Sequence, residues 1–365
     1  MEKESRAAAP EVVEIDGSFG EGGGQILRTS VSLAAITGRP VQIANIRARR
    51  SKPGLQPQHL TAVRAAAALC DAELRGAEPG SQFLRFTPGP LVDRDSFDFD
   101  VGTAGATGLV AQTLLVPMLY LPKRPATATI RGGTHVPMSP PADYIETVYR
   151  PVLHRLGVDI GFRMARAGFF PRGGGKVALT VGEGALINPV DLTERGRLQR
   201  MRLFVVTCQL PVHVADRGVD TLMRDLRGYG VPVIVEKRAL EGGNPGAAVV
   251  IVAEFENGMG GWTSLGERGK PMERVATEAL RDFQKWFGSQ AAVDEHLADQ
   301  LVLPCSLIVG ESRWSTPSIT EHLRTVLFVA QRFLPIEYTV EELPGGGGRV
   351  TLRGAGPGAR YAAIR

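Results

Sequence analysis

The stretch Gly20-Glu21-Gly22-Gly23-Gly24-Gln25-Ile26-Leu27-Arg28 joins a strand-like run, Val12 to Ile15, to an amphipathic helix. From Leu27 onward, apolar residues recur at the spacing of one helix face, and Gly38 ends the pattern. Glycines in a strand-to-helix turn let backbone N–H groups approach an anion, and the carboxylate of Glu21 can hold a metal ion beside it. The turn is not a Walker A loop, because no Gly-Lys-Ser/Thr follows it. Taken alone, it fits a tight turn without a ligand equally well.

The composition is that of a globular protein with more than one domain. A chain of 365 residues buries a large core and divides into two or more domains. No run approaches the roughly 18 apolar residues of a membrane span. The polar start, Met1 to Arg6, lacks the apolar part of a signal peptide, which predicts a cytoplasmic location. The net charge of +4 permits a polyanionic partner without requiring one. Cysteines far apart in sequence predict buried thiols: Cys70, Cys208 and Cys305.

A unit of strand, glycine turn and helix recurs along the chain, which predicts tandem α/β sandwiches of roughly 80 residues each. The first copy runs from Ile15 to Ala35, the second from Phe97 to Leu115, and we expect the third between Leu307 and Phe333. A second helix and a strand follow each of the first two copies, at 58–71 and 83–86 and at 143–156 and 176–181. The predicted fold class is therefore α/β, with three sandwich repeats forming one large domain.

The segment 193–289 has strands and helices of its own, which predicts a smaller inserted α/β domain. Its strands are expected at 202–208, 232–236 and 247–254, and its helices at 214–226 and 272–287. The large domain then comprises residues 11–192 and 290–365, and residues 1–10 are expected to form a disordered tail.

Ser318 and Glu321 fit a capping box that begins a helix, which places His322 in the first turn of that helix. The positive end of a helix dipole disfavours imidazolium, so we expect a neutral imidazole at neutral pH. The unpaired N–H groups of the same turn can bind phosphate. A neutral histidine beside a phosphate is the arrangement in which imidazole attacks phosphorus. A partly buried helix histidine bonded to a neighbour fits as well, and the pattern by itself favours that interpretation.

Asp299 and Gln300 lie upstream of His322, in the run His296-Leu297-Ala298-Asp299-Gln300-Leu301. Side by side, the two can bond a ribose or orient a metal-bound phosphate, or they can be the surface of a helix. Gln112 lies in an otherwise apolar helix, so its amide needs a partner, either in the core or in a ligand. The residues alone leave these choices open.

The run Arg47 to Gly54 carries four cations ahead of a Pro-Gly turn, which indicates an oligoanion site or a solvated basic loop. Two more glycine turns carry cations, Arg131 to Thr134 and Arg172 to Lys176. Several such turns in one chain favour phosphate handling. The six histidines and three cysteines show no zinc spacing, and no G-x-S-x-G elbow occurs.

Taken together, these segments resemble the RNA 3′-terminal phosphate cyclase family over nearly the full chain. The matching segments, in order, are 16–17, 20–28, 46–48, 52–55, 58–60, 132–134, Pro140 with Asp143-Tyr144, 171–175, 192–196, 297–301 and 322–325. One such motif would be weak, but this many in the same order are specific.

The resemblance implies a large domain of three repeats, each like the C-terminal domain of a translation initiation factor, with a smaller inserted domain. It also implies an ATP-dependent enzyme whose histidine attacks the α-phosphate of ATP and releases pyrophosphate. AMP would then pass to an RNA 3′-phosphate, and the neighbouring 2′-hydroxyl would close a 2′,3′-cyclic phosphate and expel AMP.

In that scheme His322, in the motif H-x-x-T, is the nucleophile, and Glu21 approaches the ATP phosphates through Mg²⁺ or Mn²⁺. The resemblance gives the adenylate pocket the residues Gln112, Pro140, His296, Leu297, Ala298, Asp299 and Gln300. His296 stands where family members carry a tyrosine, and an aromatic near Trp262 is expected against the adenine.

For the RNA phosphate we predict Arg47, Arg50 and Lys52, from the basic run rather than from the family. Two other classes compete with the cyclase: a non-catalytic RNA-binding relative in ribosome assembly, and an enolpyruvyl transferase-like enzyme. The first lacks the nucleophilic histidine and the intact glycine–Glu–glycine turn, whereas this chain has both His322 and Glu21. The second forms no covalent nucleotide. The expected partner is RNA with a 3′-terminal phosphate, and the sequence leaves a homodimer open.

Overall fold

The structure, a computed structural model, describes residues 11–344 and 346–356, and the first repeat lies at the start of this range. Its four-stranded sheet has the order β1-β2-β4-β3, with β1 and β2 parallel and the other neighbours antiparallel. The elements are β1 (Val13–Asp16), α1 (Gly24–Thr37), β2 (Val41–Ala44), α2 (Pro57–Cys70), β3 (Glu73–Arg75) and β4 (Leu84–Thr87). The predicted helix end at Gly38 is confirmed, because Gly38 caps α1 with a φ of 68°.

The second repeat has the same topology, with the sheet order β5-β6-β8-β7. Its elements are β5 (Ser96–Asp100), α3 (Thr107–Met118), β6 (Ala126–Gly132), α4 (Ala142–Tyr144), the π-helix η1 (Ile145–Tyr149), α5 (Arg150–Arg155), β7 (Val158–Arg166) and β8 (Gly175–Gly184). The helix predicted at 143–156 is therefore continuous but contains a π-helical segment, which periodicity does not reveal.

The third repeat also follows this order, β9-β14-β16-β15. Its elements are β9 (Asp191–Leu192), α8 (Glu295–Gln300), α9 (Val302–Ser306), β14 (Gly310–Thr316), α10 (Glu321–Phe333), β15 (Glu337–Glu342) and β16 (Gly348–Gly354). The α/β repeat fold is thus confirmed. Our placement of the third copy was wrong, however, since α10 corresponds to the second helix of a repeat. The insertion separates β9 from its helix and hides the repeat.

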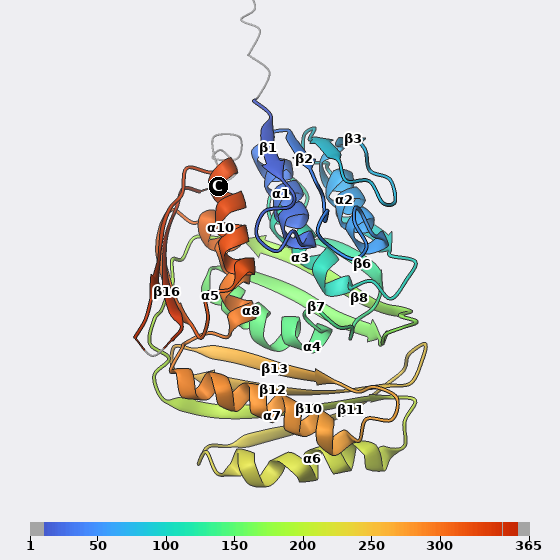
Figure 1. Cartoon of the computed structure of the whole chain (residues 1–365), viewed down its shortest axis with the longest axis vertical. Coiled ribbons are helices and arrows are strands. Elements are labelled where there is room, and N and C mark those ends of the chain that lie inside the picture. Colours follow the sequence, from blue (N-terminus) through green and yellow to red (C-terminus); the bar gives the residue numbers. More distant parts are fainter. Residues whose placement is uncertain (1–10, 345, 357–365) are drawn as a thin grey trace, which may run out of the picture.

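The inserted unit has its own sheet, of order β11-β10-β12-β13. Its elements are β10 (Leu198–Cys208), α6 (Val212–Arg227), β11 (Val233–Leu240), β12 (Gly246–Phe255), β13 (Met259–Leu265) and α7 (Met272–Ser289). Leu203 and Val205 of β10 pack under α6 and α7, whereas Phe204 and Val206 join the core of the large domain. Because successive side chains of β10 point to opposite faces, both faces of this sheet are covered. The sheet lies below the large domain in Figure 1.

Helices of different repeats pack side by side in the large domain (Figure 1). Contacts join α1 to α2, α3 and α10, and they join α2 to α3. The hydroxyl of Ser32 in α1 donates to the Thr113 carbonyl in α3 at 2.7 Å, so the two backbones approach closely. The repeats therefore share one continuous core rather than standing as separate beads.

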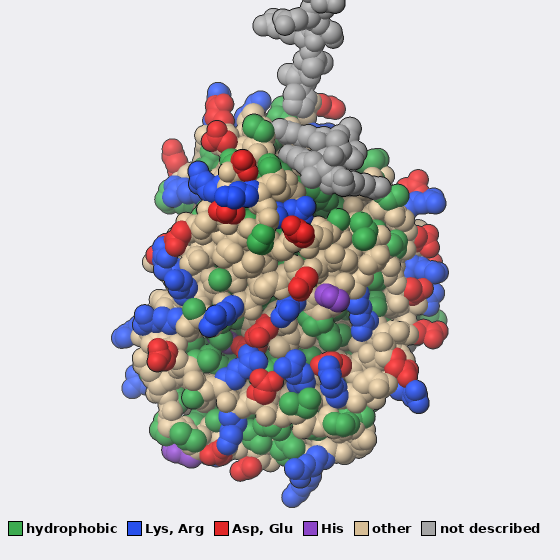
Figure 2. Space-filling view, turned by 180° about the vertical axis from the view of Figure 1, so that it is seen from behind, with side chains coloured by type: hydrophobic (Ala, Val, Ile, Leu, Met, Phe, Trp, Pro, Cys, Tyr) green, Lys and Arg blue, Asp and Glu red, His purple; other side chains and the backbone are tan. Residues whose placement is uncertain are grey.

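Several expectations on the surface and the ends can now be placed. Among the described residues, no helix is long and apolar enough to cross a membrane. All three cysteines are buried and form no disulfide among the described residues, as predicted. Seen from behind, acidic and basic side chains intersperse over the lower part of the molecule (Figure 2), which agrees with the small net charge. The tail 1–10 lies outside the described residues, and the domain boundaries at 192/193 and 289/290 stay a prediction.

Candidate active site

The N-termini of α1, α2 and α3 meet at one place in the large domain. A Cβ added at Gly24, the first residue of α1, would lie 2.4 Å from Nε2 of His59 in α2. The backbone N–H of Ala106, which caps α3, donates to Oε1 of Gln58 in α2 at 3.1 Å. Each N-terminus carries the positive end of a helix dipole. Three of them together make a site for an anion such as a phosphate.

The glycine turn before α1 packs against a fourth helix, α10, and so brings that helix next to the site. Gly20 and Gly22 have φ values of 56° and 57°, a conformation that favours glycine. A Cβ at Gly20 would lie 2.7 Å from Oγ1 of Thr325 in α10, so only glycine lets the turn lie against that helix. The turn thereby presents Glu21 to the start of α10, where Oε2 of Glu21 lies 3.8 Å from Nδ1 of His322.

His322 is the second residue of α10, and the helix starts differently from our prediction. The cap is Thr320, whose Oγ1 accepts from the N–H of Leu323 at 3.1 Å, so a capping box starting at Ser318 was wrong. The first backbone bond of the helix runs from the N–H of Arg324 to the carbonyl of Thr320 at 3.1 Å, so the helix begins after Thr320 and not after Ser318. Serine and threonine are similar caps, so the sequence alone does not decide between them. His322 nevertheless lies in the first turn.

The surroundings of His322 favour its neutral form. Burial lowers its pKa below the ordinary value, the carboxylate of Glu21 acts against this, and the nearby cations Arg28 and Arg50 add to the lowering. Its side chain is 40% exposed, so the ring remains accessible. A neutral, accessible imidazole at a helix N-terminus is suited to nucleophilic attack.

The three cations predicted to bind the RNA phosphate lie in one loop, between β2 and α2. Nη2 of Arg50 lies 3.0 Å from Oε2 of Glu21, whereas Nη2 of Arg47 donates to the carbonyl of Lys52 and braces its own loop. Within the described residues, the buried Nε atoms of Arg47 and Arg50 have no hydrogen-bond partner. The side chain of Lys52 is exposed. Of the three predicted RNA-phosphate residues, Arg50 thus lies closest to the proposed nucleophile's partner, Glu21.

Our sequence reasoning missed Arg28 and His59 as site residues. Arg28 lies one helical turn after Gly24, and Nη1 would meet a Cβ there at 2.8 Å. Burial lowers its pKa to about 10, opposed by the charge of Asp299. Burial and the two arginines Arg28 and Arg47 lower the pKa of His59 to about 3, so it stays neutral. Arg28 closes the glycine-rich stretch itself, four residues after its last glycine, and that helical spacing was the available signal.

The predicted adenylate residues occupy α8, α3 and the loop before α4. The carbonyl oxygen of Pro140 would meet a Cβ at Gly108 at 2.6 Å, and Gln112 follows one turn later on α3. Among the described residues, the buried atoms Nε2 of Gln112 and Oε1 of Gln300 lack hydrogen-bond partners. Buried polar groups are almost always bonded, so both atoms fit a bound ligand. Burial raises the pKa of Asp299 to about 7, with His296 acting in the opposite direction.

The other predicted pocket residues differ in what they can offer. Leu297 and Ala298 are fully buried in the core, and their backbone N–H groups donate to Asp294, so they shape the pocket rather than offer it polar groups. His296 is exposed at the start of α8. The ring of Trp262 packs on Phe283 and Trp286 inside the insertion, with centroids 5.1 and 4.6 Å away. Trp262 itself is therefore occupied by the core of the insertion, and an aromatic near it against the adenine stays a prediction.

Asp294 fixes α8, and sequence reasoning missed it. Its carboxylate accepts from the backbone N–H groups of His296 and Leu297 at 2.9 Å each, and from the Tyr144 hydroxyl at 2.9 Å. It also accepts from the N–H of Gly261 in β13 at 3.0 Å. One buried group thus joins the second repeat, the third repeat and the insertion. An aspartate before a helical run is an N-cap signature, so the signal was present.

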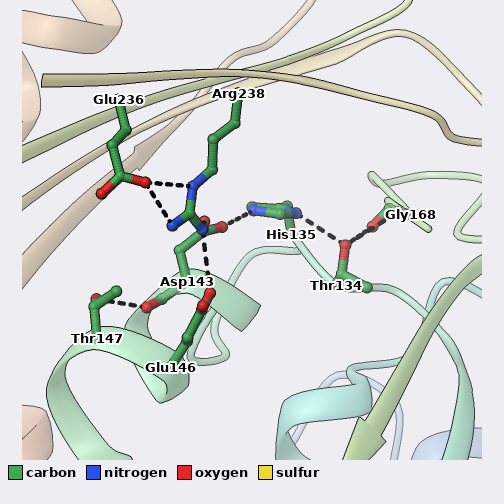
Figure 3. A network of polar contacts seen from close by, with 8 residues as sticks. All are labelled: Thr134, His135, Asp143, Glu146, Thr147, Gly168, Glu236 and Arg238. Carbon is green, nitrogen blue, oxygen red and sulfur yellow. Dashed lines mark hydrogen bonds and ion pairs between the residues drawn. The ribbon is translucent and has the colours of Figure 1, made fainter. Parts of the chain in front are cut away.

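A second buried network holds the loop that carries Pro140 (Figure 3). Nε2 of His135 lies 2.7 Å from Asp143, and Nδ1 lies 2.9 Å from the Thr134 hydroxyl. Arg238 of β11 donates to Asp143 at 2.6 Å and also pairs with Glu146 at 3.1 Å. Burial raises the pKa of Asp143, but the His135 hydrogen bond and the Arg238 charge outweigh it and keep that pKa below its ordinary value. The network therefore ties the insertion to the second repeat.

Comparison with known proteins adds the following. The family model described as RNA 3′-terminal phosphate cyclase matches residues 19–340. The RNA 3′-terminal phosphate cyclase of Nostoc punctiforme is 44% identical over 337 residues, covering 91% of this chain and 97% of that protein. That of Methylococcus capsulatus is 43% identical over 358 residues, covering 96% and 99%. The enolpyruvyl transferase NikO from Streptomyces tendae aligns with a TM-score of 0.37 and 11% identity over 95% of this chain and 49% of that one, too distant to inform the chemistry.

Proposed function

This chain belongs to the RNA 3′-terminal phosphate cyclase family, and from that premise we propose that it uses ATP to convert an RNA 3′-phosphate into a 2′,3′-cyclic phosphate. The observation that carries the proposal is a neutral, accessible His322 beside Glu21, where helix N-termini and arginines converge. These groups are suited to covalent transfer of a nucleotide from one phosphate to another.

In the first step His322 attacks the α-phosphorus of ATP. Nδ1 faces Glu21 at 3.8 Å, so Nε2 is the nitrogen that attacks and Nδ1–H keeps its proton toward the carboxylate. A nitrogen–phosphorus bond forms, the bond to the β-phosphate bridge breaks, and pyrophosphate leaves. The carboxylate of Glu21 stabilises the positive charge that the ring acquires.

In the next two steps AMP moves to the RNA and is released. An oxygen of the RNA 3′-phosphate attacks the α-phosphorus, and the bond to His322 breaks. The 2′-hydroxyl then attacks the RNA phosphorus, loses its proton and expels AMP. Arg50 and Arg28, which surround the site, would balance the phosphate charges during these transfers. Arg47 and Lys52 stay in the proposal as contacts to the RNA phosphate.

For the nucleotide, the unsatisfied amides of Gln112 and Gln300 would bond the adenylate, with Pro140, His296 and Asp299 beside them. Glu21 would hold Mg²⁺ or Mn²⁺, since a carboxylate oxygen suits these hard cations and the phosphates complete the ligand set. A divalent cation bound there would neutralise charge on the departing pyrophosphate. Among the described residues, no cluster of three His, Cys, Asp or Glu side chains lies ready for a metal.

The test is transfer of label from α-labelled ATP to the protein, with Mg²⁺ or Mn²⁺ present. We expect acid-labile, alkali-stable label on the wild type and its transfer to RNA with a 3′-phosphate. His322→Ala should remove the label, while His213→Ala, at an exposed histidine of α6, should keep it. No label on the wild type, with RNA still bound, would contradict the proposal and favour the assembly-factor alternative.

A further inference from the structure

One end of the second repeat's sheet carries a row of cations on its open face. In the strand register Arg131 of β6 lies opposite Lys176 of β8, and Lys176 lies opposite Arg166 of β7. Directly opposed residues on antiparallel strands point to the same face, and like charges in such positions destabilise the sheet. The row of cations therefore lowers the stability of the sheet locally.

The charge of this row is only partly balanced. Arg131 pairs with Asp98 and Asp100 of β5, the latter at 3.2 Å. Over residues 11–344 and 346–356, in contrast, no carboxylate lies within 4 Å of Lys176 or Arg166. The same holds there for Arg172, exposed on the turn between β7 and β8. The surplus of positive charge on this end of the sheet calls for an anionic partner.

The same turn exposes an aromatic ring. The side chain of Phe170 is 63% exposed, while its neighbour Phe169 is buried and stacks on His135 with centroids 4.7 Å apart. The buried ring of Phe169 fixes the turn, and the ring of Phe170 is exposed to solvent. An exposed ring among unpaired cations is the combination that binds single-stranded nucleic acid, because bases stack on the ring and phosphates meet the cations.

This turn borders the candidate active site. A Cβ added at Gly173 would lie 2.7 Å from Cα of Ala104, in the loop that leads to α3. A Cβ at Gly105, the next residue but one before α3, would lie 2.9 Å from Cβ of Gln58. Gln58 in turn bonds the cap of α3 beside His59. A series of direct contacts therefore joins the turn to the converging helix N-termini.

We propose that Arg131, Arg166, Phe170, Arg172 and Lys176, here called the basic rim, bind the nucleotides of single-stranded RNA that precede its 3′ end. The inference rests on the proposed function, since it extends the same site toward the body of the RNA. The terminal phosphate occupies the site, one base stacks on Phe170, and the phosphates of the preceding nucleotides meet the unpaired cations.

The test compares a triple variant, Arg166→Ala with Arg172→Ala and Lys176→Ala, and the single variant Phe170→Ala with the wild type. Substrates are a 3′-phosphorylated dinucleotide and a single strand of about 15 nucleotides. We expect KM for the long strand to rise about tenfold in both variants. KM for the dinucleotide and labelling by ATP should not change. The salt dependence of long-strand binding should weaken in the triple variant by a logarithmic slope of about 2.

A matched control removes three exposed cations from the helices of the insertion: Arg224→Ala, Arg227→Ala and Lys285→Ala. This control should leave every parameter unchanged. An equal rise of KM for both substrates, no rise at all, or tighter binding of a duplex would overturn the inference. Fluorescence anisotropy of a labelled strand measures the rim without catalysis. A protein that binds the strand through the rim but takes no label would contradict the proposed function alone.

Discussion

Two histidine–carboxylate pairs in this molecule use the same chemical groups for different purposes. The pair His135–Asp143 is 2.7 Å apart, and both side chains are fully buried. The pair His322–Glu21 is 3.8 Å apart, and the side chains are 40% and 43% exposed. Both ring nitrogens of His135 have a partner, whereas the second pair is half-exposed and lies beside Arg47 and Arg50, whose buried Nε atoms have no partner among the described residues. Satisfied polar groups stabilise a fold, and unsatisfied ones are available for chemistry.

The largest effect expected from this comparison is on stability. Asp143→Ala leaves the buried ring of His135 without its carboxylate, while the half-buried Arg238 keeps Glu146 and Glu236, so we expect a loss of about 3 kcal/mol in the free energy of unfolding. Chemical denaturation measures it. The control is Asp159→Ala, which removes an exposed partner 3.6 Å from Arg150 and should cost less than about 1 kcal/mol. Equal losses in both variants would mean that burial does not distinguish the two kinds of pair.

Glu21→Gln is expected to do the reverse. It should leave the unfolding midpoint within error and lower the rate of labelling by ATP about a hundredfold, because the exposed carboxylate serves charge rather than packing. Single-turnover labelling measures the rate. The same change at Glu337, an exposed residue of β15, is the control. A destabilised but active Glu21→Gln protein would place Glu21 with the structural pair.

The pH dependence of labelling sharpens the contrast further. The pKa of His322 is lowered, so its neutral form is complete at neutral pH and is lost only as the pH falls through a value below about 6.5. The labelling rate should therefore stay level down to that pH and then drop about tenfold per unit. Rapid-quench measurements across this range check it. A fall that begins well above pH 6.5, the ordinary value, would contradict the lowered pKa.

The smallest effect is expected at Gln112. Gln112→Ala removes an amide whose Nε2 has no partner among the described residues, so the stability of the free protein should hardly change. If ATP supplies that partner, KM for ATP should rise about tenfold while the maximal rate stays similar. Steady-state kinetics measures both parameters. The control variant is Gln42→Ala, on strand β2 of the first repeat, which should leave KM for ATP unchanged. An unchanged KM would remove Gln112 from the nucleotide pocket.

Much of the fold was predictable because its signals are local. The glycine turn, the apolar periodicity of α1, the apolar run of α3 and the cap at Gly38 each act over a few residues. The third repeat was misplaced because its strand β9 and helix α8 lie on opposite sides of the insertion. Strand β13 escaped notice because Gly260 and Gly261 weaken its strand pattern.

The candidate site was predictable only where the residues adjacent in sequence form a recognisable motif. His322 and Glu21 do so, through a helix start and a glycine turn. Arg28 and Asp294 carry a local signal, a helical spacing and an N-cap position, but their roles, like that of His59, depend on contacts with other elements of the fold. Such contacts depend on how helices pack, and no short motif encodes them.

Mapping the attachment point of AMP is the most direct measurement. The protein would be incubated with ATP and Mg²⁺ or Mn²⁺, digested under alkaline conditions and examined by mass spectrometry. The structure predicts the mass of AMP on the peptide that contains His322, bonded through nitrogen. AMP on a lysine such as Lys52, or cyclised RNA without any adenylylated peptide, would contradict the assignment of His322 as the nucleophile.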